Sequence, residues 1–248
     1  MNYEDLIKTV LPIIYFHSNE AYFPEDLNFY IENSALMQNE KEIMNRVNIN
    51  ELENYSDTSS FVLKNDLKDG SLDRATLYVR VQELETQIRF AFFVFFSFNG
   101  ALNVAGCFKA GDHRADMERF SFYLNKNSHE IEKVYLGAHG SKDGMWLVPN
   151  DFEKQNGKIV LYCALGSHAF YNEAKTYWRY LGLANDKTNK GTMWLNQKFV
   201  IMTIDYPKWQ NFQGNLGYPD NCNVPRYRGW ENEPEYSTSV LKRFFGCC

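Results

Sequence analysis

The run from Gly111 to Glu118 is the strongest candidate for chemistry in this chain of 248 residues. It reads Gly-Asp-His-Arg-Ala-Asp-Met-Glu and leads into an aromatic and apolar stretch that ends at Leu124. If a strand begins near Asp116, the two-residue period of a strand places Asp116 and Glu118 on the same face as Phe120. Buried anions are costly and repel each other, so this pair needs a cation, a proton or strong hydrogen-bond donors.

A divalent cation is one partner for the two acids. His113 lies a few residues before them, and the set His113, Asp116 and Glu118 suits Mg²⁺, Ca²⁺ or Mn²⁺. The alternative is a structural network in which Arg114 or Arg119 neutralises the acids. The spacing alone leaves both interpretations open.

Two further histidines could join this site. His139 and His168 each follow a strand-like apolar stretch and lie beside a glycine, where the chain can turn. If these strand ends meet near Asp116, they form a pocket of carboxylates and imidazoles, which suits metal binding or acid–base chemistry. The residues expected to bind a ligand or to support the metal ligands are Asp112, Arg114, His139 and His168.

The elements that must position these residues are mainly strands. From Phe61 onward the apolar pattern has a period of two, which is typical of strands. The segment 88–98 is apolar on both faces, so we expect it in the middle of the fold. This pattern predicts a mainly β protein, a two-sheet β-sandwich with short helices at the N- and C-termini. The expected strands are 77–81, 88–98, 117–124, 134–139, 145–148, 159–165 and 199–204.

The chain 1–248 is expected to form a single domain, because nothing in its composition suggests a linker. Residues 1–57 are expected to form a helical decoration around an early strand at 13–16, and 207–248 an irregular C-terminal segment. The long segments 169–191 and 207–234 are rich in Tyr, Trp, Asn and Gly, which suits a contact surface. The expected helical pieces are 2–10, 24–36, 39–48, 50–55 and 237–245.

Composition excludes some classes of function. The 26 basic residues are scattered and are outnumbered by 31 acidic ones, which argues against nucleic-acid binding. The N-terminus is acidic and no apolar run reaches membrane-spanning length, so we expect a soluble, cytoplasmic protein without a transmembrane segment. The terminal pair Cys247-Cys248 could attach lipid and hold the protein at a membrane periphery, form a disulfide or stay free.

Several segments, taken in order, resemble the vacuolar protein sorting-associated protein sixty-two family. The resemblance covers about residues 10 to 195, and the ordered combination is specific although each piece alone is weak. It adds the N-terminal block Leu11-Pro12-Ile13-Ile14-Tyr15-Phe16-His17-Ser18-Asn19-Glu20 to the segments already discussed, and we interpret His17 and Glu20 there as packing residues. The segments that carry the resemblance are 11–24, 96–101, 111–118, 134–140 and 160–169.

The run at 111–118 is also similar to the Gly-His-Arg-His-Asp-Trp-Glu heptapeptide of the necrosis- and ethylene-inducing-peptide-like toxins, which are β-sandwiches. In those toxins the corresponding histidine and acids surround a divalent ion on the way to binding a sphingolipid sugar head group. The resemblance therefore implies an ion at the matching positions here. Three departures and the missing secretion signal argue against toxin activity. The matching residues are His113, Arg114, Asp116 and Glu118, and the departures are Asp112, Ala115 and Met117.

The preferred prediction is a recognition module that holds one divalent cation at His113, Asp116 and Glu118 and recognises a polar surface such as a glycan or lipid head group. A metal-assisted hydrolase with His139 or His168 as proton shuttle is the first alternative. A self-assembling structural protein is the second. An enzyme is less favoured, and no catalytic residue is assigned, because no further cluster of acids accompanies the first.

Overall fold

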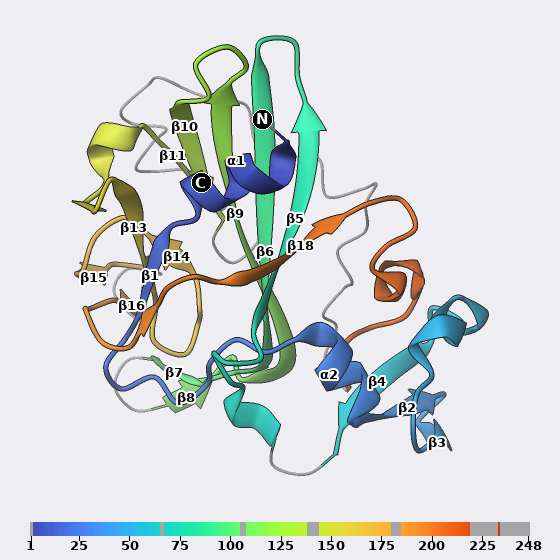
Figure 1. Cartoon of the computed structure of the whole chain (residues 1–248). Helices are drawn as coiled ribbons and strands as arrows, with labels where there is room; N and C mark the ends of the chain where they lie inside the picture. The colour runs from blue at the N-terminus through green and yellow to red at the C-terminus, as the bar shows by residue number, and fades with distance from the viewer. Residues whose placement is uncertain are drawn as a thin grey trace.

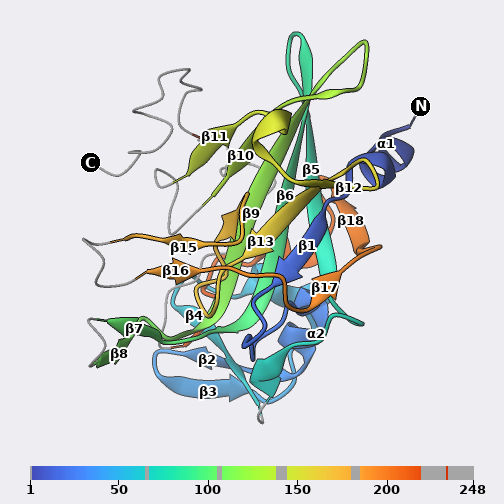
Figure 2. The same ribbon diagram turned by 90° about the vertical axis from the view of Figure 1, so that its left-hand side faces the viewer.

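The structure, a computed structural model, describes residues 2–64, 67–104, 108–137, 144–179, 185–218 and Glu233, without the side chains of 102–104 and 108–110. The fold is mainly β, as predicted, and two large sheets pack against each other (Figures 1 and 2). A third layer of smaller elements covers the other face of the larger sheet. In the part of the chain that is described, no helix is long and apolar enough to cross a membrane.

The larger sheet has six strands in the order β11-β10-β9-β6-β5-β18. Neighbouring strands in this sheet are antiparallel, except that β18 runs parallel to β5. The long strands β6 and β9 form its centre. The bounds of the six strands are β5 Thr76–Glu83, β6 Gln87–Asn99, β9 His113–Asn125, β10 Ile131–Leu136, β11 Met145–Leu147 and β18 Lys198–Met202.

The smaller sheet has the order β12-β13-β1-β17, with β14 also paired to β13. Strand β1, from the N-terminus, runs parallel to β13 and antiparallel to β17. The predicted strand at 13–16 is therefore a central strand of this sheet. The bounds are β1 Ile13–Phe16, β12 Lys154–Gln155, β13 Lys158–Cys163, β14 Phe170–Tyr171 and β17 Met193–Trp194.

The third layer consists of a small sheet and short helices, at the lower right in Figure 1. The small sheet has the order β3-β2-β4, and α2 lies beside it. Two further strand pairs, β7-β8 and β15-β16, lie in the loops. The bounds are α2 Leu27–Glu32, β2 Ser34–Gln38, β3 Lys41–Met44, η1 Ile49–Asn54, β4 Ser59–Leu63, η2 Leu67–Asp69, β7 Leu102–Val104, β8 Phe108–Ala110, η3 Pro149–Asp151, β15 Thr176–Tyr177, β16 Asp186–Lys187 and η5 Lys208–Asn211.

The two faces of the larger sheet bury separate apolar clusters, because successive strand residues point to opposite faces. Phe92 and Phe120 face the smaller sheet, with ring centroids 4.8 Å apart. Phe93 and Phe95 face the third layer. The segment 88–98 is thus buried on both sides in the middle of the fold, as its sequence predicted.

The N-terminal third differs most from its predicted elements. The helix α1, Tyr3–Val10, and the 3-10 turn η1 agree with prediction. The helix expected to reach residue 36 ends at Glu32, and 39–48 belongs mostly to the β2–β3 hairpin instead of a helical turn. That hairpin turns at Asn39 and Glu40, whose φ angles of 48° and 64° are positive. The sequence here lacks the glycine that usually signals such a turn. The helix expected at 237–245 lies outside the described residues.

Candidate functional site

Asp116 and Glu118 lie on the inward face of β9, as the strand period predicted. In the register with β6, Asp116 is opposite Phe96 and Glu118 is opposite Val94, and both of these β6 residues face the smaller sheet. The side chain of Asp116 is 14% exposed, whereas Glu118 is buried. The two acids therefore lie at the boundary between the core and solvent.

Burial raises the pKa of Glu118 well above its usual range, and the negative charges of Asp116 and Asp186 raise it further. The guanidinium groups of Arg119 and Arg179 lower this pKa, but by less. Glu118 therefore favours its protonated form, which is one of the solutions expected for buried adjacent acids.

His168 reaches the acids of β9 from the turn that follows β13. Its φ of 58° turns the chain so that the ring stacks on Phe96, with centroids 3.8 Å apart and planes at 4°. Its Nδ1 lies 3.3 Å from Oδ2 of Asp116, and its Nε2 lies 3.7 Å from Oε1 of Glu20. The predicted meeting of this strand end with Asp116 is confirmed.

His168 is completely buried between two carboxylates. Burial alone lowers the pKa of an imidazole, because it disfavours the charged form. The hydrogen bond with Asp116 and the interactions with Glu20 outweigh burial and raise the pKa of His168 to about 8. His168 is thus the cation of this cluster at neutral pH.

Glu20 is the second partner of His168, in the loop after β1. Its Oε1 accepts hydrogen bonds from the backbone N–H of Ala21 at 3.0 Å and Tyr22 at 2.9 Å, and its Oε2 from Gly166 at 2.8 Å. Burial opposes ionisation, but His168 and these donors lower the pKa of Glu20 below its usual value. Sequence reasoning interpreted Glu20 as a packing residue and missed this role. The one available signal was its place, three residues after His17, in the block that carries the family resemblance.

Asp186 is a fourth acid of the cluster that sequence reasoning missed. It lies in β16, within the segment interpreted as a contact surface, and is completely buried. Its Oδ1 accepts a hydrogen bond from Ser167 at 2.6 Å, and its Oδ2 from Tyr171 at 2.5 Å. The Nε of Arg179 lies 3.7 Å from Oδ2. We call Glu20, Asp116, Glu118, His168 and Asp186 the acid cluster.

The remaining predicted site residues lie elsewhere or outside the described residues. His113 is half-buried, and its Nδ1 lies 3.2 Å from the carbonyl oxygen of Ala115. Arg114 donates to the carbonyl oxygen of Tyr218 at 2.8 Å, and Asp112 is exposed. His139 lies outside the described residues. The structure therefore brings together Asp116, Glu118 and His168 from the predicted set.

The divalent cation at His113, Asp116 and Glu118 stays a prediction. Among the residues that the structure describes, no group of three or more His, Cys, Asp or Glu side chains is arranged to hold a metal ion. The three predicted ligands do not converge on one point in this arrangement, because Asp116 contacts His168 and the Nδ1 of His113 lies beside the carbonyl oxygen of Ala115.

A sequence comparison identifies the family. Residues 2–217 match the family described as Vacuolar protein sorting-associated protein 62. The chain belongs to this family. The resemblance seen in the sequence is confirmed, and the Vacuolar protein sorting-associated protein 62 match includes every residue of the acid cluster. No curated protein matches the chain significantly.

Solved structures of necrosis- and ethylene-inducing proteins match most of the chain at low sequence identity. NLPPya in complex with glucosamine shares 11% identity over 87% of this chain and 83% of that chain, with a TM-score of 0.48. A structure reported as a toxin fold for microbial attack and plant defense shares 12% identity over 86% and 83%, with a TM-score of 0.47. Necrosis and Ethylene inducing Protein 2, from the causal agent of cocoa's Witches Broom disease, shares 11% over 87% and 85%, with a TM-score of 0.43.

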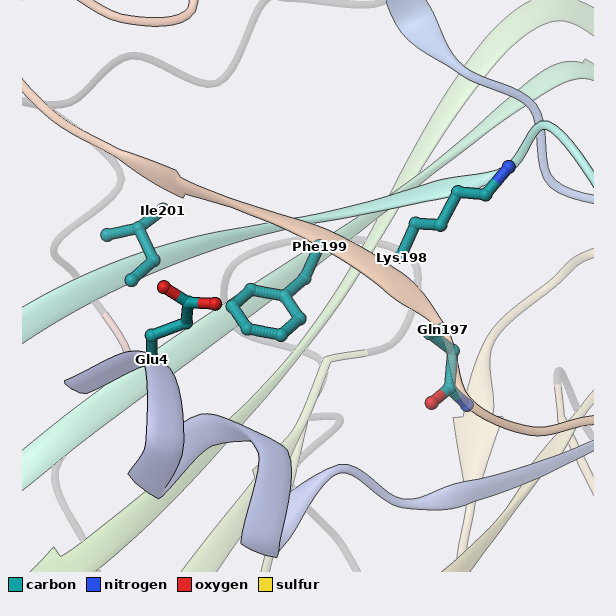
Figure 3. A pocket seen from close by; sticks show the side chains of 5 residues that line it. All are labelled: Glu4, Gln197, Lys198, Phe199 and Ile201. Atoms are coloured by element: carbon teal, nitrogen blue, oxygen red, sulfur yellow. The ribbon is translucent and has the colours of Figure 1, made fainter. Parts of the chain in front are cut away.

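A pocket of about 550 Å³ lies apart from these residues, between α1 and β18. Figure 3 shows the Glu4 carboxylate of α1 directed toward Phe199 and Ile201 of β18. Gln197 and Lys198 complete the lining. None of the lining residues belongs to the acid cluster, so the candidate site and this pocket are separate features.

Proposed function

We propose that this protein is a recognition module that binds a divalent cation at Asp116 and Glu118, and a polar group such as a glycan or lipid head group beside it. The two adjacent carboxylates on one face of β9, with Glu118 buried and Asp116 partly exposed, are the observation that carries the proposal. They mark a place where a cation could replace a proton, since a carboxyl group must lose its proton to bind metal. The partial exposure of Asp116 connects that place with solvent.

The charges around Glu118 support a cation as an alternative to the proton. Asp116 and Asp186 act against its ionisation, and Arg119 and Arg179 act in favour. The desolvation of Glu118 then decides the balance. A bound divalent ion would change it, because an ion is the largest local charge in such a site. Binding this ion requires His113 to turn from Ala115 or another oxygen donor to take its place.

An exposed aromatic residue beside the acid cluster supports recognition of a polar ligand. Trp178 is 79% exposed, and Trp side chains are enriched at interfaces because they combine a large apolar ring with a polar N–H. It immediately precedes Arg179, which pairs with the buried Asp186. Tyr171 and Tyr177, stacked with centroids 3.7 Å apart, hold the segment in place. The predicted contact surface at 169–191 is therefore attached directly to the charged residues.

Thermal melting after chelation tests the cation. We expect Mg²⁺, Ca²⁺ or Mn²⁺ to raise the melting temperature of the wild type, because an ion that binds only the folded state stabilises it. Asp116→Asn should abolish the rise, and the exposed control Asp57→Asn, far from the predicted site in the sequence, should keep it. The affinity should increase up to about tenfold per pH unit while Glu118 must release its proton. If none of the three ions shifts the melting temperature, the protein is not a divalent-cation binder.

Titration with a panel of monosaccharides and lipid head groups in the presence of the effective ion tests recognition. We expect Trp178→Ala to weaken binding at least about tenfold, the range of a contact residue that dominates an interface. Tyr206 is also exposed, at 51%, so Tyr206→Ala is a matched control that should bind normally. Equal binding by both variants would argue against Trp178 as the contact residue.

The structure favours binding over hydrolysis. A proton shuttle must come within hydrogen-bond distance of its substrate, but His168 is completely buried and held between Asp116 and Glu20. His139, Cys247 and Cys248 lie outside the described residues. A proton shuttle at His139, self-association, and a cytoplasmic location at a membrane periphery therefore stay predictions.

A further inference from the structure

A second buried polar site lies on the opposite face of the larger sheet from the acid cluster. Arg89 of β6 is opposite Tyr123 of β9, and Ser121 lies two residues along β9 on the same face. These three side chains point away from the smaller sheet, and each is buried. We call Arg89, Ser121 and Tyr123 the cradle.

The cradle holds the carboxylate of Glu233, which is more than a hundred residues farther along the chain. One carboxylate oxygen accepts a hydrogen bond from Ser121 Oγ at 2.5 Å and pairs with the Arg89 guanidinium, and the other accepts from the Tyr123 hydroxyl. The Glu233 side chain is 3% exposed. Three donors from two adjacent strands therefore converge on a single anion.

The cradle requires an anion for electrostatic reasons. The Arg89 side chain is only 4% exposed, and its Nη1 also donates a hydrogen bond to Gln82 at 3.2 Å. Among the residues that the structure describes, its Nε has no hydrogen-bond partner. A buried guanidinium left without an anion is costly, and Arg and carboxylate match in shape and charge. The Nζ of Lys133, which lies 4.5 Å from the centroid of the Tyr123 ring, adds positive charge beside the cradle.

The anion and the cradle come from different parts of the chain. Arg89, Ser121 and Tyr123 lie within residues 2–217, which match the family, whereas Glu233 lies beyond the end of that match. The body of the domain thus presents a complete set of donors, and a separate segment supplies the acceptor.

We propose that the cradle is a binding site for carboxylate groups, and that Glu233 is a built-in competitor that blocks it. The external ligand is the carboxylate of a small organic acid, which presents the same planar anion as the Glu233 side chain. This site is separate from the acid cluster. A negative result for the cation proposal would therefore not affect it.

Rescue of Glu233→Ala in the full chain by a small carboxylate tests this site. Removing the carboxylate should lower the melting temperature, since Arg89 stays buried without its anion. Formate or acetate should restore at least half of the loss, whereas chloride or phosphate at equal ionic strength should not. In Glu25→Ala the partner Arg74 is 43% exposed, so water can replace the anion and no carboxylate-specific recovery is expected. Recovery with all anions, or with none, would overturn the proposal.

Titration with acetate tests the competition by Glu233. Wild type should bind acetate at least about tenfold more weakly than Glu233→Ala, because an intramolecular competitor acts at a high effective concentration. Adding Tyr123→Phe to Glu233→Ala should weaken acetate binding while the protein stays folded, since this change removes only one hydroxyl donor. Equal acetate affinity of wild type and Glu233→Ala would place binding elsewhere. Unchanged affinity on adding Tyr123→Phe would also exclude the cradle.

Discussion

Two regions of the acid cluster, the loop after β1 and the strand β9, treat a buried glutamate in opposite ways. Glu20 in the loop has a lowered pKa, and Glu118 in the strand has a strongly raised one. Burial opposes ionisation in both places. The difference lies in the partners, because Glu20 faces His168 and three backbone N–H groups, whereas Glu118 faces two other acids. Hydrogen-bond donors and His168 outweigh burial at Glu20, whereas at Glu118 burial prevails and the neighbouring acids add to it.

This difference divides the cluster into a fixed part and an adjustable part. Glu20 connects the loop after β1 with the turn at Gly166 and with His168 of the same turn, so its charge holds two distant segments together. The raised pKa of Glu118 favours its protonated form, so its charge contributes less to holding segments together. Breaking the first part should therefore cost stability, and altering the second should cost little.

The largest expected effect is that of Glu20→Ala. The substitution removes the acceptor of three backbone N–H groups and one of the two carboxylates beside His168, and the Glu20 side chain is 1% exposed. We expect a loss of about 3–5 kcal/mol in the free energy of unfolding, the range for removing one partner of a buried pair. Urea unfolding measures it. Glu4→Ala, at a position 58% exposed, should change stability by less than about 0.5 kcal/mol.

A smaller change in stability is expected when rising pH removes the proton of His168. Its pKa is about 8 in the folded protein against 6.5 in the unfolded chain, so its stabilising contribution is complete below pH 6.5 and is lost as pH rises through 8. The shift corresponds to roughly 2 kcal/mol. Urea unfolding of wild type and His168→Gln between pH 6 and 9 measures the difference. A constant difference over this range would mean that His168 does not titrate there.

The smallest loss of stability is expected for Glu118→Gln at neutral pH. Glutamine resembles the protonated acid in shape and charge and needs no proton on folding, so we expect the variant to be at least as stable as the wild type in urea unfolding. Because the pKa of Glu118 is raised, its contribution to stability decreases as pH rises above 4.5, and Glu118→Gln should remove this dependence. A loss as large as that of Glu20→Ala would show that Glu118 is ionised in the folded protein.

The strands of the larger sheet were predictable because their pattern is local. The segment 88–98 has apolar residues on both faces, and only a central, doubly covered strand buries them all. The β2–β3 hairpin was not predictable from its polar residues, since Asn39 and Glu40 take positive φ without a glycine. Packing of the third layer on Phe93 and Phe95 is decided by contacts distant in sequence.

The acid cluster was predictable in part for the same reason. Strand alternation gave the shared face of Asp116 and Glu118, and the position of His168 after a strand and beside a glycine suggested where it would lie. Glu20 and Asp186 come from loops without a regular period. Their roles depend on where the chain crosses from one sheet to another, which no local pattern records.

The position of β1 has a consequence for how the chain is made. This strand is synthesised long before its partners, because Ile13 pairs with Val160, and Tyr15 with Met193. At a synthesis rate of 5–20 residues per second, the nascent strand waits roughly 10–30 s for its neighbours. During that time an apolar segment remains exposed, and closure of the smaller sheet becomes a late, slow event in folding.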